Sequence, residues 1–280
     1  MTASTPIFLL TDFGNQDTYV GQVKAVLSTR APGVPLFSLT HEVSPFAIDE
    51  GAWLLETALP FLPVPAVVLA VVDPGVGSER LPIAVRAPVS ADPTAVRYFV
   101  GPDNGLLSSV VGSLARPSKS EVSPVPPAID VREIQKERVG VALESISATF
   151  EGRDVFAPAA ASIAVGNDFK TLGPRCKELT LLPPFAGTYE GGSLSGSVVH
   201  IDRYGNLITT IRREQLPIDF RIEIRDHCIE RMVRTFSDVA IGALACHVDS
   251  SGFLAIAVRE GNAAARTGGV RGDAVLLTPL

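Results

Sequence analysis

The sequence is short of charge, of cysteine and of long apolar runs, and each shortage excludes a class of protein. Only 19% of the 280 residues are charged, and the formal net charge is −6. Binding to nucleic acid needs a basic surface, which this chain does not offer in bulk, so we expect no nucleic-acid partner. No apolar run approaches the roughly 20 residues that a membrane-spanning helix needs, so we expect no membrane partner either.

Cysteine and histidine are too few and too scattered for a disulfide framework or a metal cage. The three cysteines lie at positions 176, 228 and 246, far apart and odd in number. The four histidines show no HxxxH spacing, and no CxxC pair occurs, so we predict no metal site. The N-terminal segment has no charged stretch before its apolar residues, so we expect no secretory signal. Together these features predict a reduced, cytoplasmic protein.

Apolar residues are abundant, at 46%, and the run from Ala66 to Val72 is almost purely aliphatic. This composition predicts a strand buried on both faces, which ends at Asp73 before a proline and two glycines. Ligands of open α/β sheets bind beyond the carboxyl ends of the strands, so Asp73 and the nearby Arg80 form a candidate site. The alternative is a strand closed by an ordinary Asp-Pro-Gly turn.

The first half of the chain repeats a strand, an acidic turn and a helix. Residues 6–11 predict a strand that ends at Asp12, and Asp17 is placed to cap a helix with Val20 and Val23 on its apolar face. Further strands are expected at 34–39, 83–85 and 98–100, and helices at 48–59, at 129–140 (charged and solvated) and from the 149–154 motif to residue 165. The alternation predicts an α/β domain with a mostly parallel sheet and helices on both faces.

A Pro- and Gly-rich stretch over residues 182–196 separates this half from a different pattern. Beyond it, short strand-like runs alternate with turn residues and lack helical periodicity, which predicts a smaller all-β, barrel-like domain. We therefore expect an N-terminal α/β domain over 1–184, a linker over 185–196 and a C-terminal β domain over 197–280.

Seven motifs, in this order and spacing, resemble the S-adenosylmethionine hydroxide adenosyltransferases, relatives of the fluorinase and chlorinase that attack the same substrate with halide. The motifs are TDFG (11–14) with Asp17 and Lys24, LTHE (39–42), DPGVG (73–77), GPDNGLL (101–107), TFEGRD (149–154), DRYGN (202–206) and GNAA (261–264). Each motif alone is weak, but together they cover nearly the whole chain. The resemblance implies an N-terminal α/β domain, a C-terminal barrel-like domain and a homotrimer with active sites at the subunit interfaces.

The activity implied by the resemblance is hydrolysis of S-adenosylmethionine to adenosine and L-methionine, by in-line attack of an activated water on the ribose C5′. Methionine leaves as a neutral thioether, so the reaction needs no general acid, no metal and no cofactor. The site must hold the water in line behind the C–S bond and take up its proton. Two alternatives are a chlorinase-like halide adenosyltransferase and a non-catalytic protein that binds adenosine or S-adenosylmethionine.

The resemblance also implies roles for individual residues. Asp12 would bind the two ribose hydroxyls, because an ionised carboxylate only accepts hydrogen bonds. Asp73 and Arg80 match two of the three polar residues around the attacking water, and the halide-using relatives carry tyrosine at position 73. Since a carboxylate repels halide, Asp73 favours water. The remaining substrate-binding residues are Asp17, Asp202 and Ser250 near the amino-acid part, and Tyr204, Asn206 and Phe236 around adenine.

Position 151 departs from the family pattern, which reads TFHGRD where this chain has TFEGRD. Glu151 could replace the histidine as the base, with a pKa raised by Asp73, or the site could be impaired. A second departure is Ser251, where the fluorinase has an arginine for the methionine carboxylate, and Arg259 could compensate for its loss. Phe46 aligns with a fluorinase tryptophan near the ribose but is equally compatible with the core.

Structural roles are expected for three further features of the sequence. His41 is predicted to be hydrogen-bonded within the fold, and Trp53 is predicted to be in the core. Arg153 and Asp154 are predicted to form an ion pair at the start of a helix.

Overall fold

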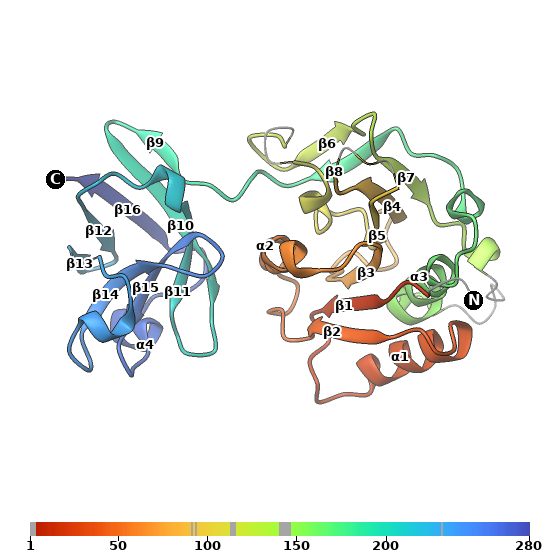
Figure 1. The fold of residues 1–280 in the computed structure, drawn as a ribbon, viewed down its shortest axis with the longest axis horizontal. Coiled ribbons are helices and arrows are strands. Elements are labelled where there is room, and N and C mark those ends of the chain that lie inside the picture. Colours follow the sequence, from red (N-terminus) through yellow and green to blue (C-terminus); the bar gives the residue numbers. More distant parts are fainter. Residues whose placement is uncertain (1–3, 91, 93, 113–115, 140–146, 231) are drawn as a thin grey trace. The chain divides into compact units, whose positions relative to one another are not determined.

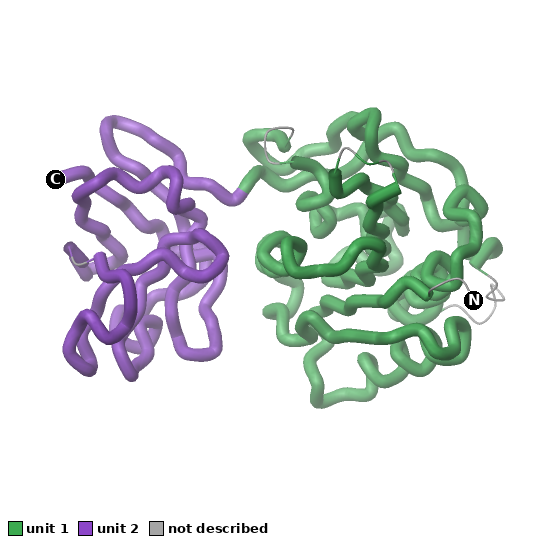
Figure 2. The backbone as a smooth tube through the Cα atoms, in the orientation of Figure 1, with its two compact units in different colours: residues 1–184 green, residues 185–280 purple. Residues whose placement is uncertain are grey.

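The computed structural model describes residues 4–90, 92, 94–112, 116–139, 147–230 and 232–280. The chain forms two compact units, Met1–Pro184 and Phe185–Leu280, which are coloured separately in Figure 2. Each unit has its own hydrophobic core. Among the described residues, no helix has the length and apolar character needed to cross a membrane.

Unit 1 is built on a six-stranded mixed sheet in the order β2-β1-β3-β5-β4-β7 (Figure 1). The strands are β1 (Ile7–Thr11), β2 (Leu36–Thr40), β3 (Ala66–Val71), β4 (Pro82–Pro88), β5 (Val96–Pro102) and β7 (Asp130–Glu133). The pairs among β2, β1, β3 and β5 are parallel, whereas β4 is antiparallel to both of its neighbours. The predicted α/β fold is confirmed, and the parallel part of the sheet is the part that carries the candidate site.

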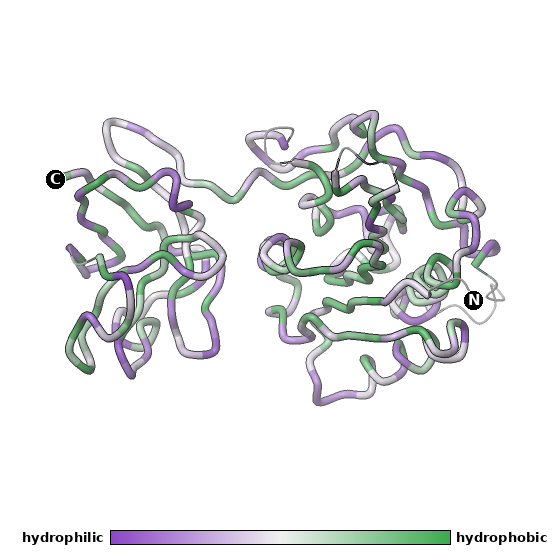
Figure 3. Tube along the Cα trace, in the orientation of Figure 1, coloured by the Kyte–Doolittle hydropathy of each residue, from purple (hydrophilic) through white to green (hydrophobic). Residues whose placement is uncertain are grey.

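The central strand β3 is buried on both faces, as its aliphatic composition predicts. Val67 and Leu69 belong to the core on one face, with residues of α1 (Tyr19–Arg30) and α3 (Ala157–Ala164). Val68 and Ala70 belong to the core on the other face, which includes α2 (Ile48–Ala58). Figure 3 shows hydrophobic residues along these central strands. Helices therefore cover both faces of the sheet.

Two local predictions in unit 1 are wrong. Thr18, not Asp17, is the residue before α1, and its side chain makes no capping hydrogen bond. Residues 129–139, predicted as part of a solvated helix, form β7 and the short helix η4 (Lys136–Val139), and residue 140 lies outside the described residues. The reason is burial, because Val131 and Ile134 are 0% and 1% exposed and pack into the cores on opposite faces of the sheet.

The rest of unit 1 consists of short elements. They are η1 (Leu59–Phe61), η2 (Ser108–Val110), β6 (Glu121–Pro124), the π-helical turn η6 (Gly152–Phe156), η7 (Phe169–Leu172) and β8 (Glu178–Leu181). Strands β6 and β8 pair with each other in a two-stranded sheet. The η6 turn runs directly into α3, so the Ala-rich helix predicted from the 149–154 motif is present with a π-helical first turn.

Unit 2 is an antiparallel, nearly closed barrel-shaped sheet in the order β13-β12-β16-β10-β11-β15-β14, with β9 paired to β10. The strands are β9 (Thr188–Glu190), β10 (Ser193–Ile201), β11 (Leu207–Arg212), β12 (Phe220–Ile224), β13 (His227–Ile229), β14 (Leu244–Val248), β15 (Phe253–Val258) and β16 (Ala274–Pro279). Three short helices are η8 (Arg213–Gln215), η9 (Phe236–Asp238) and α4 (Ala263–Thr267). The barrel-like C-terminal fold is therefore confirmed.

The stretch expected to be a linker, 185–196, contains β9 and the first residues of β10. Gly191 and Gly192 lie between these strands with φ of 58° and 84°. Glycine adopts this left-handed backbone without steric cost, so the pair forms the turn of a hairpin. The glycines that suggest a linker in the sequence are part of the sheet of unit 2.

Candidate active site

Two carboxylates lie side by side at the carboxyl edge of the parallel strands in unit 1. Asp12 directly follows β1 and Asp73 follows β3 after one residue, and the two strands are paired with Thr11 opposite Val71. Because β1 and β3 are parallel neighbours, both acids lie at the same edge of the sheet. Asp73 is near enough to raise the pKa of Asp12.

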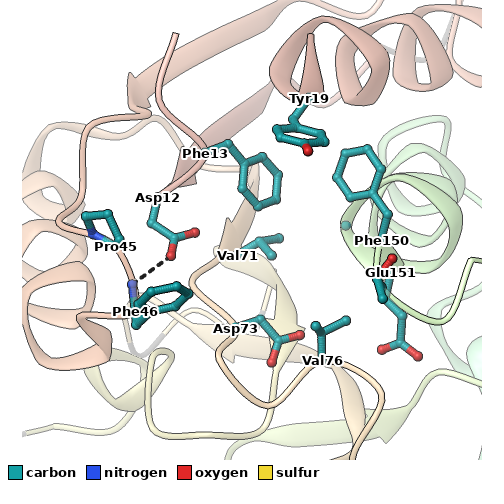
Figure 4. A pocket seen from close by; sticks show the side chains of 12 residues that line it. Asp12, Phe13, Tyr19, Pro45, Phe46, Val71, Asp73, Val76, Phe150 and Glu151 are labelled. Atoms are coloured by element: carbon teal, nitrogen blue, oxygen red, sulfur yellow. Dashed lines mark hydrogen bonds between the residues drawn. The ribbon is translucent and has the colours of Figure 1, made fainter. Parts of the chain in front are cut away.

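The two acids line a pocket of about 260 Å³, drawn in Figure 4. This is several times the roughly 30 Å³ that one water molecule takes up in the liquid, so the pocket has room for part of an organic ligand. Most of its wall is aromatic or aliphatic. The lining residues are Asp12, Phe13, Tyr19, Pro45, Phe46, Val71, Asp73, Val76, Thr149, Phe150, Glu151 and Gly152.

Three aromatic rings form one wall of the pocket. Phe13, Tyr19 and Phe150 meet edge to face, with ring centroids 5.3 to 6.3 Å apart. A Cβ on Gly152 would come within 3.1 Å of the Phe13 ring, so glycine at this position lets the ring approach the start of the η6 turn. Packing thus links the segment after β1 to the 149–154 motif, which supplies Glu151.

Phe46 holds Asp12 through its backbone. Its N–H donates to Oδ2 of Asp12 at 3.0 Å, and its φ of 68° lies in the left-handed region that non-glycine residues rarely occupy. The Phe46 side chain is 71% exposed, so the possibility of a core residue is excluded. Such backbone conformations concentrate at functional sites.

The pKa of the Asp12 carboxyl is raised from its ordinary value. Burial is the largest cause, because it disfavours the charged form, and the neighbouring Asp73 adds to it. Hydrogen bonds from the backbone N–H groups of Phe46 and of Asp12 itself act in the opposite direction. These backbone donors are therefore the groups that favour the charged form of Asp12, and no cation is among the causes of its pKa shift.

Asp73, Arg80, Glu151 and Lys136 form a chain of alternating charges, which we call the charge ladder. Arg80 binds Asp73 through two hydrogen bonds, Nε to Oδ1 at 2.9 Å and Nη2 to Oδ2. The same Nη2 donates to Oε2 of Glu151 at 2.6 Å, and Nζ of Lys136 donates to Oε1 at 2.5 Å. The side chains of Asp73, Arg80 and Glu151 are 6%, 10% and 5% exposed, so three of the four charges are buried.

The ladder contradicts the expected raised pKa of Glu151, which is instead lowered. Burial is the largest single influence and raises it, but the hydrogen bonds from Lys136 and Arg80 and the charges of these two cations together outweigh it. Arg80 lies between the two carboxylates, so Asp73 is not the group that Glu151 faces. Glu151 is therefore an ionised carboxylate that accepts hydrogen bonds from two cations, Arg80 and Lys136.

Asp73 and Glu151 line the pocket, whereas Arg80 does not. The guanidinium carbon of Arg80 lies 5.4 Å from the centre of the Phe156 ring, on the first turn before α3. The segment after β3 also lies very close to the segment before η6, since a Cβ on Gly77 (φ 79°) would come within 2.9 Å of the Ala148 carbonyl oxygen. Arg80 thus orients the two carboxylates from behind the pocket wall.

The predicted structural roles of His41, Trp53 and the Arg153–Asp154 pair are confirmed. His41 is 5% exposed and bridges the hydroxyls of Thr11 and Ser38 at 2.9 and 2.8 Å, while Trp53 is 4% exposed. Arg153 Nε donates to Oδ1 of Asp154 at 2.6 Å. Because Thr11 immediately precedes Asp12, the His41 bridge also steadies the end of β1.

The remaining predicted residue of unit 1, Asp17, is exposed in the turn before α1 and does not line the pocket. Sequence reasoning missed Lys136, because it was assigned to a solvated helix. The only signal for it was its place in a charged segment. Within the described part of the chain, no group of three or more His, Cys, Asp or Glu side chains is arranged to hold a metal ion.

The predicted residues of unit 2 lie on its turns. Asp202 accepts hydrogen bonds from the backbone N–H groups of Tyr204 and Asn206, both at 2.9 Å, and from the Asn206 amide at 2.7 Å. This arrangement closes the β10–β11 turn and leaves the Tyr204 side chain 75% exposed while Asn206 is buried. The structure thus brings these three residues together. Ser250 is exposed in the turn after β14.

Phe236 packs against His247 of β14, a residue that sequence reasoning did not select. The two rings meet edge to face with centroids 4.8 Å apart. The pKa of His247 is lowered by burial, against the opposing influence of Asp249 and Asp202. Arg259 donates to the Val239 carbonyl at 2.7 Å, so it stabilises the segment after η9 and is already engaged there.

Comparisons with known proteins agree on one family. Residues 7–173 match the S-adenosylmethionine hydroxide adenosyltransferase N-terminal domain, and residues 196–276 match the C-terminal domain of the same family. A Thermus thermophilus protein named (R)-S-adenosyl-L-methionine hydrolase is 39% identical and aligns with 92% of this chain and 93% of its own. A hydrolase of the same name from Salinispora tropica is 37% identical over 99% of both chains.

The chain is also similar to a more distant enzyme sequence and to a solved structure. A fluorinase of Actinoplanes sp. is 26% identical over 90% of both chains. The crystal structure of an uncharacterized conserved protein from Thermotoga maritima is 31% identical, with a TM-score of 0.82 over 97% of this chain and 99% of that one.

Proposed function

Because the chain belongs to the S-adenosylmethionine hydroxide adenosyltransferase family, we propose that it hydrolyses S-adenosylmethionine to adenosine and L-methionine. The similarity to (R)-S-adenosyl-L-methionine hydrolases over nearly the whole chain supports this activity. The observation that carries the proposal is the pair of carboxylates, Asp73 and Glu151, held by one guanidinium in the wall of the pocket that Asp12 also lines.

The proposed reaction is a single displacement at the ribose C5′. A water oxygen forms a bond to C5′ while the C5′–S bond breaks, and the bonding electron pair stays on sulfur. The sulfonium loses its positive charge and leaves as a thioether, so the positive charge leaves the site as the proton of the water. The site therefore needs a proton acceptor and no acid.

We propose that Asp73 positions the water and accepts its proton. Each carboxylate oxygen has two acceptor positions, and Arg80 uses one on each oxygen of Asp73, so a second remains for water. Arg80 and Glu151 keep this carboxylate in place, which is the type of preorganisation that lowers barriers without later rearrangement. Halide would enter a pocket lined by three carboxylates, of which Asp12 has no cationic partner among the described residues, so electrostatic repulsion disfavours the halide reaction.

We propose that the remaining predicted residues bind the substrate. Asp12 would accept from the ribose hydroxyls. Asp17, Asp202 and Ser250 would contact the amino-acid part, and Tyr204, Asn206 and Phe236 would surround adenine. As the family resemblance implies, we also propose a homotrimer with sites at its subunit interfaces, working in the cytoplasm without a metal or other cofactor.

Incubation of the purified protein with S-adenosylmethionine in ¹⁸O-labelled water, with and without chloride, tests the function. We expect adenosine that carries ¹⁸O at C5′ and L-methionine in equal amounts, at a rate that does not depend on chloride. A 5′-chloro product would identify a halide enzyme. Binding without either product would leave a binding protein and would contradict the hydrolase.

Asp12→Asn is expected to raise the KM for S-adenosylmethionine about 10- to 100-fold, with a smaller effect on kcat. The asparagine keeps an oxygen for the Phe46 N–H but loses the charge that strengthens hydrogen bonds to the ribose, and each such bond contributes about 1.5–3 kcal/mol. Steady-state kinetics measure both constants. Glu190→Gln, which removes an exposed carboxylate of unit 2, is the control, and an unchanged KM in Asp12→Asn would exclude Asp12 from ribose binding.

A further inference from the structure

The charge ladder ends at a residue that has no assigned part in the reaction. We propose that Lys136 is a positioning residue of this active site, which acts through Glu151 and Arg80 to hold Asp73 in its reactive orientation. The inference rests on the proposed hydrolysis and adds a fourth residue to Asp73, Arg80 and Glu151.

Every carboxylate oxygen of Asp73 and Glu151 accepts a hydrogen bond from a cation. Both oxygens of Asp73 accept from Arg80, one oxygen of Glu151 accepts from Arg80, and its other oxygen accepts from Lys136. Nη2 of Arg80 donates to both acids, so its two hydrogens are both used. A change at Glu151 therefore changes the donor that Asp73 shares with it.

Lys136 also balances the charge of the buried part of the ladder. Asp73, Arg80 and Glu151 are all at most 10% exposed and together carry one net negative charge. Lys136 brings the sum to zero. Without its ammonium, Glu151 would keep one cationic partner and an unpaired buried oxygen, which favours either protonation or rotation of the side chain. In both cases the hydrogen bonds of Arg80 rearrange around Asp73.

The exposure of Lys136 separates this role from a merely structural one. Its side chain is 37% exposed, and exposed ion pairs contribute little to stability. If Lys136 were only a surface partner, its loss would leave turnover and its pH dependence unchanged. If it positions the ladder, its loss lowers kcat while the substrate still binds.

Among the described residues, Glu151 faces Arg80 from the segment after β3 and Lys136 from η4, and Asp73 is reached through Arg80. On its own segment, Arg153 and Asp154 are paired with each other. Removal of Lys136 thus removes one of the two cations that lower the pKa of Glu151. The acid limb of the kcat profile should then move to higher pH.

The test is a double-mutant cycle on Lys136 and Glu151. We expect Lys136→Met to lower kcat about tenfold, the effect of losing one charged hydrogen bond, with KM nearly unchanged. Lys136→Arg should restore most of the activity. In the Glu151→Gln background, Lys136→Met should cause no further loss, because the charge that it balances is gone. Lys170→Met, at an exposed lysine of η7, is the control.

The proposal would be overturned by losses of kcat that add up in the double variant, or by an acid limb of the kcat–pH profile that does not move in Lys136→Met. It would also be overturned if Lys136→Met lowered kcat and 1/KM equally.

Acid unfolding of the substrate-free protein gives a second readout. Because the pKa of Glu151 is lowered in the folded protein, its contribution to stability is complete above its ordinary value of 4.5 and is lost as the pH falls through the lower folded-state pKa. In Lys136→Met this stabilisation is lost at higher pH, so the acid midpoint should rise, and an unchanged midpoint would contradict the ladder. A wild-type protein without turnover would instead refute the hydrolysis itself.

Discussion

Arg80→Met is expected to abolish measurable turnover and to destabilise the protein by about 3–5 kcal/mol at neutral pH, the usual cost of removing one partner from a buried charge pair. Arg80 is 10% exposed and is the only group in the charge ladder that binds both Asp73 and Glu151. Its removal leaves two buried carboxylates facing each other across the space of the guanidinium. Positioning of the water is lost together with the charge balance.

The pH dependence identifies the cause of this destabilisation. In the variant, the repulsion is relieved when one of the two carboxylates takes up a proton, so the folded state binds more protons than the unfolded one and stability falls as the pH rises. Denaturant unfolding at about pH 5 and about pH 8 should therefore show a smaller deficit at the lower pH. A deficit that does not depend on pH would mean lost packing, including the contact with Phe156.

Two further variants serve as controls for Arg80→Met. Arg225→Met removes an exposed arginine that pairs with Asp273 in unit 2, and we expect little change in stability, because solvent screens exposed ion pairs. Arg80→Lys keeps the charge but not the planar pair of donors, so it should fold better than Arg80→Met and remain poorly active.

Asp73→Asn is expected to lower kcat by about 10²- to 10⁴-fold, the range over which a positioned proton acceptor contributes, and to leave KM nearly unchanged. The amide has the size of the carboxylate and keeps one oxygen for Arg80, but it cannot take up the proton of the attacking water. Comparison with Asp12→Asn separates the two acids, because one change should act on kcat and the other on KM.

Equal losses in kcat and in substrate affinity would contradict the role given to Asp73 and would make it a binding residue. Chloride provides a second check. With the charge removed, the pocket repels halide less, so a trace of 5′-chloro product from Asp73→Asn and none from the wild type would support the view that the carboxylate excludes halide.

The sheet edge that carries the site could be predicted from the sequence because its signals are local. The aliphatic run of β3 and the acids after β1 and β3 place Asp12 and Asp73 at the carboxyl ends of strands, and the pairing of these strands brings the acids together. The charged segment after residue 129 misled the prediction, because β7 buries only one of its residues, Val131, which is too weak an apolar signal to reveal a strand.

The pKa shifts of the site could not be predicted from the sequence, because they depend on which cation lies next to each carboxylate in the folded chain. The sequence places Glu151 near Asp73 through the family motif, but only the fold puts Arg80 between them and Lys136 beyond. The sign of the pKa shift of Glu151 changes for that reason. The left-handed backbone of Phe46 is likewise imposed by the loop that brings its N–H to Asp12.

The zero sum of the charge ladder has a consequence for the order of events in the proposed cycle. Since Asp73 and Glu151 are neutralised by Arg80 and Lys136, Asp12 is the one lining carboxylate, among the residues that the structure describes, without an ion-pair partner. The arriving sulfonium is positive and is attracted to this pocket. After the C–S bond breaks, the adenosine carries no charge, because the positive charge is now on the proton that Asp73 accepts and later gives up to solvent, and the same pocket holds uncharged adenosine less strongly. Chemistry thus removes the attraction that brought the substrate in, which favours release of the product.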